Sequence, residues 1–215
     1  MQERLIRRAA SLICGRDGVG GLEVLFVERG ADSRFLAGYV AFPGGAVDAE
    51  DEVLASRWFG DSGQAPRAAS IRETAEETGL ALTADGGVAA PAADHLAPVH
   101  AAPPAPGDLP EVCHWIAPED VPVRFDARYF AAALPLGLVP VPDGGETAAA
   151  WWSPPGALME EWSRGVRKLY WPTYLTMLHV AGCLATVDLL AMRFETRDPT
   201  PEEEATLPTS VMEER

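Results

Sequence analysis

Cysteine, lysine and long apolar runs are scarce in this sequence, and each absence narrows the classes of protein to consider. The 215 residues include three cysteines, Cys14, Cys113 and Cys183. Because they are widely spaced, odd in number and set among apolar residues, we expect reduced core thiols rather than a disulfide framework or a catalytic thiol. Cys and His also lack the spacing that is typical of a zinc site.

Long apolar segments are missing as well. No stretch reaches the roughly 18 apolar residues that a membrane-spanning helix requires. The nearest approach, residues 175–192, is interrupted by polar residues and glycine. The first eleven residues carry three arginines but no apolar core of a signal peptide. We therefore expect a cytoplasmic protein without a membrane partner.

Positively charged residues are also scarce. The chain has 17 Lys and Arg residues but 32 Asp and Glu residues, and Lys168 is the only lysine. The net charge of −15 argues against polymeric nucleic acid as a partner. A small anionic ligand would need a metal ion and a local basic patch. With 47% hydrophobic residues, the chain can bury one substantial core. We predict a single domain over residues 1–196 and a flexible, Pro- and Glu-rich tail over residues 197–215.

What the sequence does contain is an acidic helix. A helix is predicted from Pro66 to Thr78, since proline suits a first helical turn and the glycine that follows suits a left-handed cap. At 3.6 residues per turn, Glu73, Glu76 and Glu77 lie within an arc of about 100°. Small and apolar residues occupy the opposite side, namely Ala68, Ile71, Ala75, Thr78 and Leu82. One face can therefore pack while the other presents three carboxylates.

Three neighbouring carboxylates repel one another, and their pKa values rise unless a cation neutralises them. Oxygen ligands suit a hard ion such as Mg²⁺ or Mn²⁺ better than zinc, and Mg²⁺ points to phosphate chemistry. The alternative is a solvated acidic helix face with no ligand, which is common in proteins.

A glycine loop precedes this helix at Phe42-Pro43-Gly44-Gly45, where a backbone without Cβ atoms can approach a ligand closely. Together, the loop and the helix resemble the Nudix hydrolases, whose box reads G-x5-E-x7-R-E-U-x-E-E-x-G-U with U an aliphatic residue. With Gly45 as the first glycine, Asp51 replaces the first glutamate, and residues 72–80 match the remainder except for Thr74 at an aliphatic position. The resemblance implies an α/β/α sandwich with a mixed sheet.

Twenty residues separate Asp51 from Arg72 where the family has seven. This insertion carries Trp58, Phe59, Gly60 and Gly63, and we predict that it forms a short loop before the helix. A lengthened box is similar to that of the peroxisomal coenzyme A diphosphatases, which residues 113–118 and 124–130 also resemble.

A second motif resembles the coenzyme A diphosphatase branch, whose signature is L-L-T-x-R-[SA]-x3-R-x3-G-x3-F-P-G-G. Arg29, Arg34, Gly38 and residues 42–45 fall at its spacings, whereas Val27 and Gly30 depart from it. Two guanidinium groups near a glycine loop can grip phosphates by bidentate hydrogen bonds. The alternative is that both arginines merely pair with nearby surface acids.

The family resemblance implies roles for residues of this chain. Mg²⁺ or Mn²⁺ would be held by Glu73, Glu76, Glu77 and the Gly45 backbone. Arg72 would brace the carboxylates, and either Glu73 or the loop acid Glu146 would act as general base. Substrate-binding residues would be Arg29, Arg34, Gly38, Phe42 and Gly44. By analogy with the family, a homodimer is possible.

The resemblance leaves several functions open. The favoured one is metal-dependent hydrolysis of coenzyme A or an acyl-coenzyme A to phosphopantetheine and adenosine 3′,5′-bisphosphate. A Nudix hydrolase of ADP-ribose, NADH or dinucleoside polyphosphates is the nearest alternative. A non-catalytic, nucleotide-binding Nudix-like module belongs to a different class, although such modules usually lack the acids retained here.

Hydrophobic patterning predicts the other elements. We expect strands over residues 9–14, 23–28, 80–83, 111–117, 127–133 and 147–153, and helices over residues 154–165 and 172–192. Residues 84–110 are rich in Ala, Pro and Gly and predict a long loop with a single helical turn. In that loop, His95 and His100 are expected to be exposed to solvent.

Overall fold

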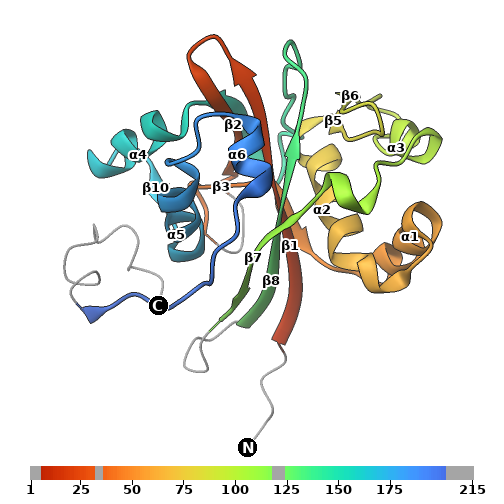
Figure 1. Cartoon of the computed structure of the whole chain (residues 1–215), viewed down its shortest axis with the longest axis horizontal. Coiled ribbons are helices and arrows are strands. Elements are labelled where there is room, and N and C mark those ends of the chain that lie inside the picture. The colour runs from red at the N-terminus through yellow and green to blue at the C-terminus, as the bar shows by residue number, and fades with distance from the viewer. Residues whose placement is uncertain (1–5, 32–35, 118–123, 202–215) are drawn as a thin grey trace, which may run out of the picture.

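The computed structural model describes residues 6–31, 36–117 and 124–201 and shows one sheet between two layers of helices (Figure 1). Helices α1, α2 and α3 cover one face of the sheet, and α4, α5 and α6 cover the other. The predicted α/β/α sandwich with a mixed sheet is therefore confirmed.

The main path of the sheet has the order β10-β3-β2-β1-β8-β7, with β4 paired to β1 and β9 paired to β2. The bounds are β1 Ile6–Gly18, β2 Gly21–Arg29, β3 Tyr39–Ala41, β4 Gly44–Ala46, β7 Glu111–Ile116, β8 Arg124–Ala133, β9 Thr147–Ser153 and β10 Lys168–Leu169. The sheet is mixed because β1 runs parallel to β8 but antiparallel to β2. Two short strands, β5 (Leu80–Ala81) and β6 (Val88–Ala89), pair separately.

Six α-helices and two 3₁₀ turns occur in the described part of the chain. Their bounds are α1 Ala49–Phe59, η1 Ser62–Gln64, α2 Ala65–Thr78, α3 Ala97–Ala101, η2 Pro106–Asp108, α4 Pro155–Ser163, α5 Trp171–Val180 and α6 Thr186–Ala191. Among residues 6–31, 36–117 and 124–201, no helix has both the length and the apolar character needed to cross a membrane.

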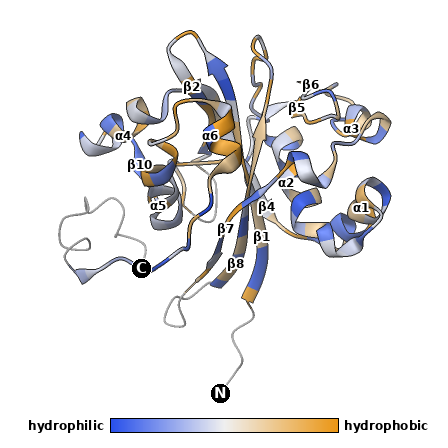
Figure 2. Cartoon of the chain, viewed as in Figure 1, coloured by the Kyte–Doolittle hydropathy of each residue, from blue (hydrophilic) through white to orange (hydrophobic). Residues whose placement is uncertain are grey.

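The core is divided by the sheet into two hydrophobic clusters, because successive residues of a strand point to opposite faces. On β1, Ile13 packs toward α4, α5 and α6, whereas Leu12 and Cys14 pack toward α1 and α2. Cys14 and Cys113 are buried free thiols, and Cys183 is a half-buried one. Figure 2 shows hydrophilic residues near the lower ends of β1 and β8, where two pockets described below are found.

The predicted loop between Asp51 and Arg72 is wrong, since most of the insertion is helical. Helix α1 begins after Asp48 and ends at Gly60, which caps it with a left-handed backbone (φ 72°). Leu54, Ala55 and Trp58 are buried on its inner face. Their spacing of one and four residues suits one helical face, so the insertion packs as a helix against α2.

The single helix predicted over residues 172–192 is also wrong, because it is divided into α5 and α6. The Asp188 carboxylate accepts hydrogen bonds from the backbone N–H groups of Leu184 and Ala185 at 2.9 and 3.1 Å, which starts a new helix there. Three residues that a continuous helix would bury are instead exposed, namely Leu178, Leu184 and Val187.

The segment over residues 84–110 contains β6, α3 and η2 rather than one helical turn in a loop. His95 and His100 are half-buried, not solvent-exposed as predicted. His100 Nδ1 accepts a hydrogen bond from Trp58 Nε1 at 3.0 Å. The segment is thereby joined to α1, on the side of the sheet away from α4 and α5.

Candidate active site

Helix α2 forms where the sequence predicts it, with Pro66 in its first turn and Gly79 (φ 63°) as its left-handed cap. The Gly79 N–H closes the last turn by donating to the Ala75 carbonyl at 3.0 Å. Small residues on its inner side, including Ala68 and Ala75, are fully buried and let the helix lie close to β1. The acidic residues are therefore held by a helix packed firmly on the sheet.

Arg72 is the centre of the charged network on this helix. Its Nε and Nη2 atoms donate to the two carboxylate oxygens of Asp51 at 2.9 and 3.0 Å. Its Nη1 atom lies 2.9 Å from both Glu73 Oε1 and Glu76 Oε2. Burial alone would lower the pKa of Arg72, but these three acids outweigh burial and raise it. Arg72 is thus a permanent cation that orients the carboxylates, the bracing role proposed from the sequence.

Asp51 has a role that the sequence analysis did not assign. Its side chain is completely buried and lies between Arg72 and the backbone N–H of Asp48, which donates to it at 2.8 Å. It occupies the position of the first glutamate of the Nudix box, so its match to that motif could have indicated a role at the site. The buried pair with Arg72 fixes the start of α1 to the middle of α2.

Glu73 and Glu77 lie directly behind the glycine loop. The Gly44 N–H donates to Glu77 Oε2 at 2.9 Å. A Cβ atom built on Gly45 would be only 2.6 Å from the Glu73 carboxylate, so any side chain at this position would collide with it. Gly45 therefore leaves room for Glu73, whereas Gly44 leaves room for β1, because a Cβ atom there would lie 2.3 Å from the Ala10 carbonyl oxygen.

Burial is the main cause of the unusual titration of these two acids. It raises the pKa of Glu77 to about 8, with the charges of Glu73 and Glu146 adding and the Gly44 hydrogen bond opposing. Burial likewise raises the pKa of Glu73 to about 7, against the effect of Arg72. By contrast, the Glu76 side chain is 47% exposed. Glu73 and Glu77 are therefore the two acids of this face whose charged forms are disfavoured by burial.

The chemistry of these donors fits a hard divalent cation. Buried carboxylates with raised pKa values are stabilised in their charged form when a cation neutralises them. Within the described residues, no three Asp, Glu, His or Cys side chains are arranged to hold a metal ion as they stand. Arg72 contacts both Glu73 and Glu76, so Glu76 would have to turn away from Arg72 to join Glu73 and Glu77 around an ion.

A pocket of about 310 Å³ opens beside the glycine loop, and we call it the glycine-loop pocket. One side of it is formed by three pairs of facing residues in the parallel strands β1 and β8. These pairs are Arg7 with Phe125, Ala9 with Ala127 and Ser11 with Tyr129. The small side chains of Ala9, Ser11 and Ala127 leave the space that the surrounding aromatic side chains enclose.

Several predicted site residues meet in the glycine-loop pocket. Its lining includes Arg29, Phe42, Gly44, Gly45, Glu77 and Glu146. Arg29 Nη2 lies 3.1 Å from Glu146 Oε1, although 117 residues separate them in sequence. Glu146 is 64% exposed on a loop that follows Gly144 and Gly145, whereas Arg29 is 21% exposed.

Two predicted substrate-binding residues are not placed in this lining. Gly38 adopts φ 75°, and its N–H donates to the Arg29 carbonyl at 3.0 Å, so it shapes the turn behind Arg29. Arg34 lies outside the described residues. Conversely, the sequence analysis gave no site role to Ser11 or Tyr170, which line the pocket. The pairing of β1 with β4 places Ser11 opposite Gly44, and Tyr170 is the residue that precedes α5.

Comparisons with known proteins agree with this geometry. A family model described as the NUDIX domain matches residues 5–170. A NUDIX hydrolase from Alicyclobacillus acidocaldarius is 30% identical to the chain, with a TM-score of 0.76 over 89% of this chain and 98% of that chain. No curated protein matches the sequence.

More distant structures share the fold. The NUDIX domain of Shewanella oneidensis NrtR complexed with ADP ribose is 14% identical, with a TM-score of 0.52 over 81% of this chain and 86% of that chain. A MutT NUDIX hydrolase from Burkholderia pseudomallei is 17% identical, with a TM-score of 0.51 over 81% of this chain and 98% of that chain. At these identities the likeness concerns the fold alone.

Proposed function

Since the chain belongs to the NUDIX domain family and is a hydrolase of pyrophosphate-bond substrates, we propose that it cleaves a nucleoside diphosphate linked to another group. The favoured substrate is coenzyme A or an acyl-coenzyme A, which would yield phosphopantetheine and adenosine 3′,5′-bisphosphate. The observation that carries this proposal is the meeting of Glu77, Glu146 and Arg29 in one pocket. An acidic chain that acts on an anionic substrate needs carboxylates to hold a cation and a guanidinium group to bind a phosphate.

Arg29 is the residue that we propose binds a phosphate group of the substrate. Its guanidinium lies at Glu146 in the glycine-loop pocket, and Arg7 lines the same pocket. A phosphate that enters would compete with the Glu146 carboxylate for Arg29. Release of Glu146 by this exchange would let it turn toward the reacting diphosphate, because Gly144 and Gly145 precede it.

The aromatic wall of the pocket supports a nucleotide as the ligand. Trp115, Phe125 and Tyr129 all line it, and Tyr129 also packs edge-on against Phe42 with ring centroids 6.3 Å apart. Aromatic rings provide large apolar surfaces for a heterocyclic base. We propose that the adenine of the substrate lies against this wall.

The divalent cation, Mg²⁺ or Mn²⁺, would be held by Glu73, Glu76 and Glu77 with the Gly45 backbone beside them. When bound there, it supplies positive charge at the diphosphate and acidifies water. Gly44 fixes one oxygen of Glu77 through its N–H, which leaves the other oxygen for the ion. Arg72 keeps Glu73 and Asp51 in place by its own hydrogen bonds.

The proton of the attacking water would be accepted by Glu73 or Glu146. A general base works best when its pKa is near the working pH, and without a cation burial raises the pKa of Glu73 to about 7. A cation held by Glu73 would lower this pKa. Glu146 is the more mobile candidate, because it lies on an exposed loop after two glycines. The substitution Glu146→Gln distinguishes them, because the acidic limb of the pH–rate profile disappears if Glu146 is the base and persists if Glu73 is. Glu73→Gln is less informative, because it also removes a proposed ligand of the cation.

A panel of diphosphates with Mg²⁺ or Mn²⁺ tests the function. Coenzyme A, dephospho-coenzyme A, ADP-ribose and NADH are incubated with the chain, and the products are identified by mass. We expect the kcat/KM for coenzyme A to exceed that for dephospho-coenzyme A by about tenfold or more, since a charge-assisted phosphate contact supplies about 1.5–3 kcal/mol. Equal rates for the two would contradict the coenzyme A assignment, and no hydrolysis of any diphosphate would contradict the enzymatic one.

ADP-ribose is the second candidate substrate. The NUDIX domain of NrtR is complexed with ADP ribose and shares the fold of this chain. ADP-ribose carries the same adenosine diphosphate unit but no 3′-phosphate. It becomes the better assignment if its kcat/KM is higher than that of coenzyme A in the panel.

A further inference from the structure

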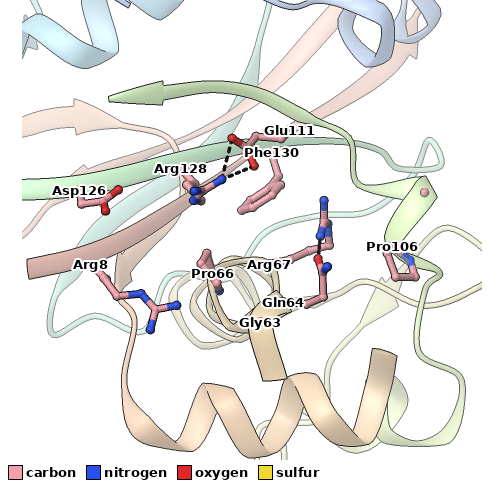
Figure 3. A pocket seen from close by; sticks show the side chains of 11 residues that line it. Arg8, Gly63, Gln64, Pro66, Arg67, Pro106, Glu111, Asp126, Arg128 and Phe130 are labelled. Atoms are coloured by element: carbon pink, nitrogen blue, oxygen red, sulfur yellow. Dashed lines mark hydrogen bonds and ion pairs between the residues drawn. The ribbon is translucent and has the colours of Figure 1, made fainter. Parts of the chain in front are cut away.

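A second pocket of about 520 Å³ lies on the opposite face of the sheet from the glycine-loop pocket (Figure 3). Its arginines, Arg8, Arg67 and Arg128, come from β1, α2 and β8, and we call it the arginine pocket. Arg8 follows Arg7, and Arg128 follows Ala127, in strands whose successive side chains point to opposite faces. The same two strands therefore build both pockets, one on each side.

The arginine pocket is positive although the chain has a net charge of −15. Its lining contains three arginines but only two carboxylates, Glu111 and Asp126. Asp126 is paired with His114 and Arg8 with Glu52, and both partners lie outside the lining. Such a concentration of arginine in an acidic chain is not expected from composition and needs a local reason.

The guanidinium of Arg67 is held rigidly in the pocket. Its Nε donates to the Leu109 carbonyl at 3.0 Å, its Nη1 donates to Gln64, and its Cζ atom lies 4.7 Å from the Phe130 ring centroid. Burial lowers the pKa of Arg67, with Glu111 opposing and the charge of Arg128 adding. Within the described part of the chain, Arg67 Nη2 donates to no protein group, so it retains donors for a ligand.

Arg128 is occupied by an internal counterion. Its Nη1 atom donates to both oxygens of Glu111, at 2.8 and 3.0 Å, and the two side chains are 40% and 35% exposed. Among the described residues, its Nε and Nη2 atoms have no hydrogen-bond acceptor. Glu111 therefore holds Arg128 in the way that a bound anion would, and an anion of higher charge can compete for it.

The start of α2 faces the same pocket, since Gly63, Gln64 and Pro66 contribute to its lining. The first turn of this 14-residue helix has no acidic residue, and Gln64 makes no side-chain cap. The partial positive charge of the helix end therefore adds to the charges of the three arginines.

From this arrangement we propose that the arginine pocket is a second binding site for a small phosphate-bearing anion. Arg67 and Arg8 would donate to its oxygens, and Arg128 would join them when Glu111 is displaced. A cavity of this volume is larger than a single phosphate group, which favours a phosphate monoester over inorganic phosphate. The site is independent of the proposed hydrolysis, because no residue of the glycine-loop pocket belongs to it.

Amide NMR locates the binding directly. The ¹⁵N-labelled chain, free of divalent ions and at constant ionic strength, is titrated with ribose 5-phosphate in one arm and inorganic phosphate in the other, with ribose and chloride as blanks. We expect saturable shifts of the amides of Gly63, Arg67 and Gly107. Saturation with either phosphate supports the site, and saturation with ribose 5-phosphate at lower concentration identifies a monoester as its ligand.

Three substitutions test the proposal, and one of them is the control. Arg8→Gln should weaken binding about tenfold, because it removes a charge-assisted donor. Arg57→Gln, the matched change at an exposed arginine of α1 outside the lining, should leave binding unchanged. Glu111→Gln should strengthen binding severalfold, because Arg128 loses its internal counterion.

The proposal is overturned if the shifts are confined to Gly44 and Gly45, since the anion would then occupy the glycine-loop pocket alone. It is equally overturned if binding does not saturate, or if Arg8→Gln and Arg57→Gln have the same effect. The Arg8 contact with Glu52 is 3.4 Å long and joins half-exposed groups, so its loss should not unfold the chain. A native-like amide spectrum of each variant verifies this.

Discussion

At the scale of single residues, the three glutamates of α2 have different environments despite their close spacing. Glu77 is 6% exposed and bound by the glycine loop, Glu73 lies against Gly45, and Glu76 is half exposed beside Arg72. The helical period predicted that they share a face. It could not predict their order of burial, which depends on where the glycine loop crosses the helix.

Glu77→Gln is expected to abolish metal-dependent hydrolysis. The substitution removes the charge of the most buried of the three glutamates but keeps its shape, so the loss of kcat should be at least about 100-fold. Steady-state kinetics measures this, and far-UV circular dichroism should show an unchanged fold. Glu160→Gln, at an exposed position of α4, serves as the control. A Glu77→Gln enzyme with full turnover would contradict the proposed metal site.

Stability without divalent ions should fall as the pH rises. The pKa of Glu77 is raised from 4.5 in an exposed carboxyl to about 8 in the fold, so the folded state holds its proton more tightly than the unfolded state. The stabilisation from this proton is complete below about pH 4.5 and is lost as the pH rises through 8, a change on the order of 5 kcal/mol. Urea denaturation in EDTA at several pH values measures it. Glu77→Gln should make the profile less steep, with the remaining slope due to Glu73, and an equally steep profile in that variant would contradict the assignment.

The lining of the glycine-loop pocket shows what the sequence could not reveal about the site. Arg29, Phe42 and Gly44 were predicted because they belong to one continuous motif. Ser11 was not predicted, because its place depends on the antiparallel pairing of β1 with β4, in which Ser11 lies opposite Gly44. Local spacing carries no information about such a pairing.

At the scale of elements, the pair of Asp51 and Arg72 joins α1 to α2. Asp51→Asn is expected to lower the free energy of unfolding by about 3 kcal/mol, because it removes the completely buried partner of Arg72 and leaves only the more exposed Glu73 and Glu76. Chemical denaturation measures the change. Glu52→Gln is the matched control, since Glu52 forms only a half-exposed pair with Arg8 and should cost less than about 1 kcal/mol. Equal effects of the two substitutions would mean that the buried pair does not hold the helices together.

Sequence patterns predicted strands better than they predicted the inserted and C-terminal helices. The strand at residues 147–153 was placed correctly, because small and aromatic residues there lie between clear turns. The insertion was interpreted as a loop because Gly60 and Gly63 stood out, whereas Leu54 and Trp58 mark a buried helix face only once α2 lies beside them. In the same way, Asp188 divides α5 from α6 by a cap that hydrophobic periodicity does not register.

At the scale of the whole molecule, the two hydrophobic clusters share the strands β1 and β8. Ile13 and Tyr129 belong to one cluster, while Leu12 and Phe130, their neighbours in sequence, belong to the other. Because β1 and β8 contribute side chains to both clusters, unfolding of these strands would expose both clusters to water. This sharing supports the proposal of a single domain over residues 1–196.

One cooperative unfolding transition is therefore expected. Far-UV circular dichroism reports the sheet and helices, and near-UV circular dichroism reports tryptophans of both clusters, including Trp58 and Trp115. Their thermal transitions should coincide within error. Two separated midpoints would show that the helical layers unfold independently and would contradict the single domain.

The segment after α6 lies along β7, the last strand of the sheet path. The Phe194 N–H donates to the Val112 carbonyl at 3.3 Å, and the Thr196 hydroxyl donates to the His114 carbonyl. Residues 194–196 thus cover the free edge of β7, where a strand of a second molecule could otherwise pair. A chain cut after Met192 would expose these carbonyls, and we expect it to aggregate at concentrations where the intact chain remains dispersed.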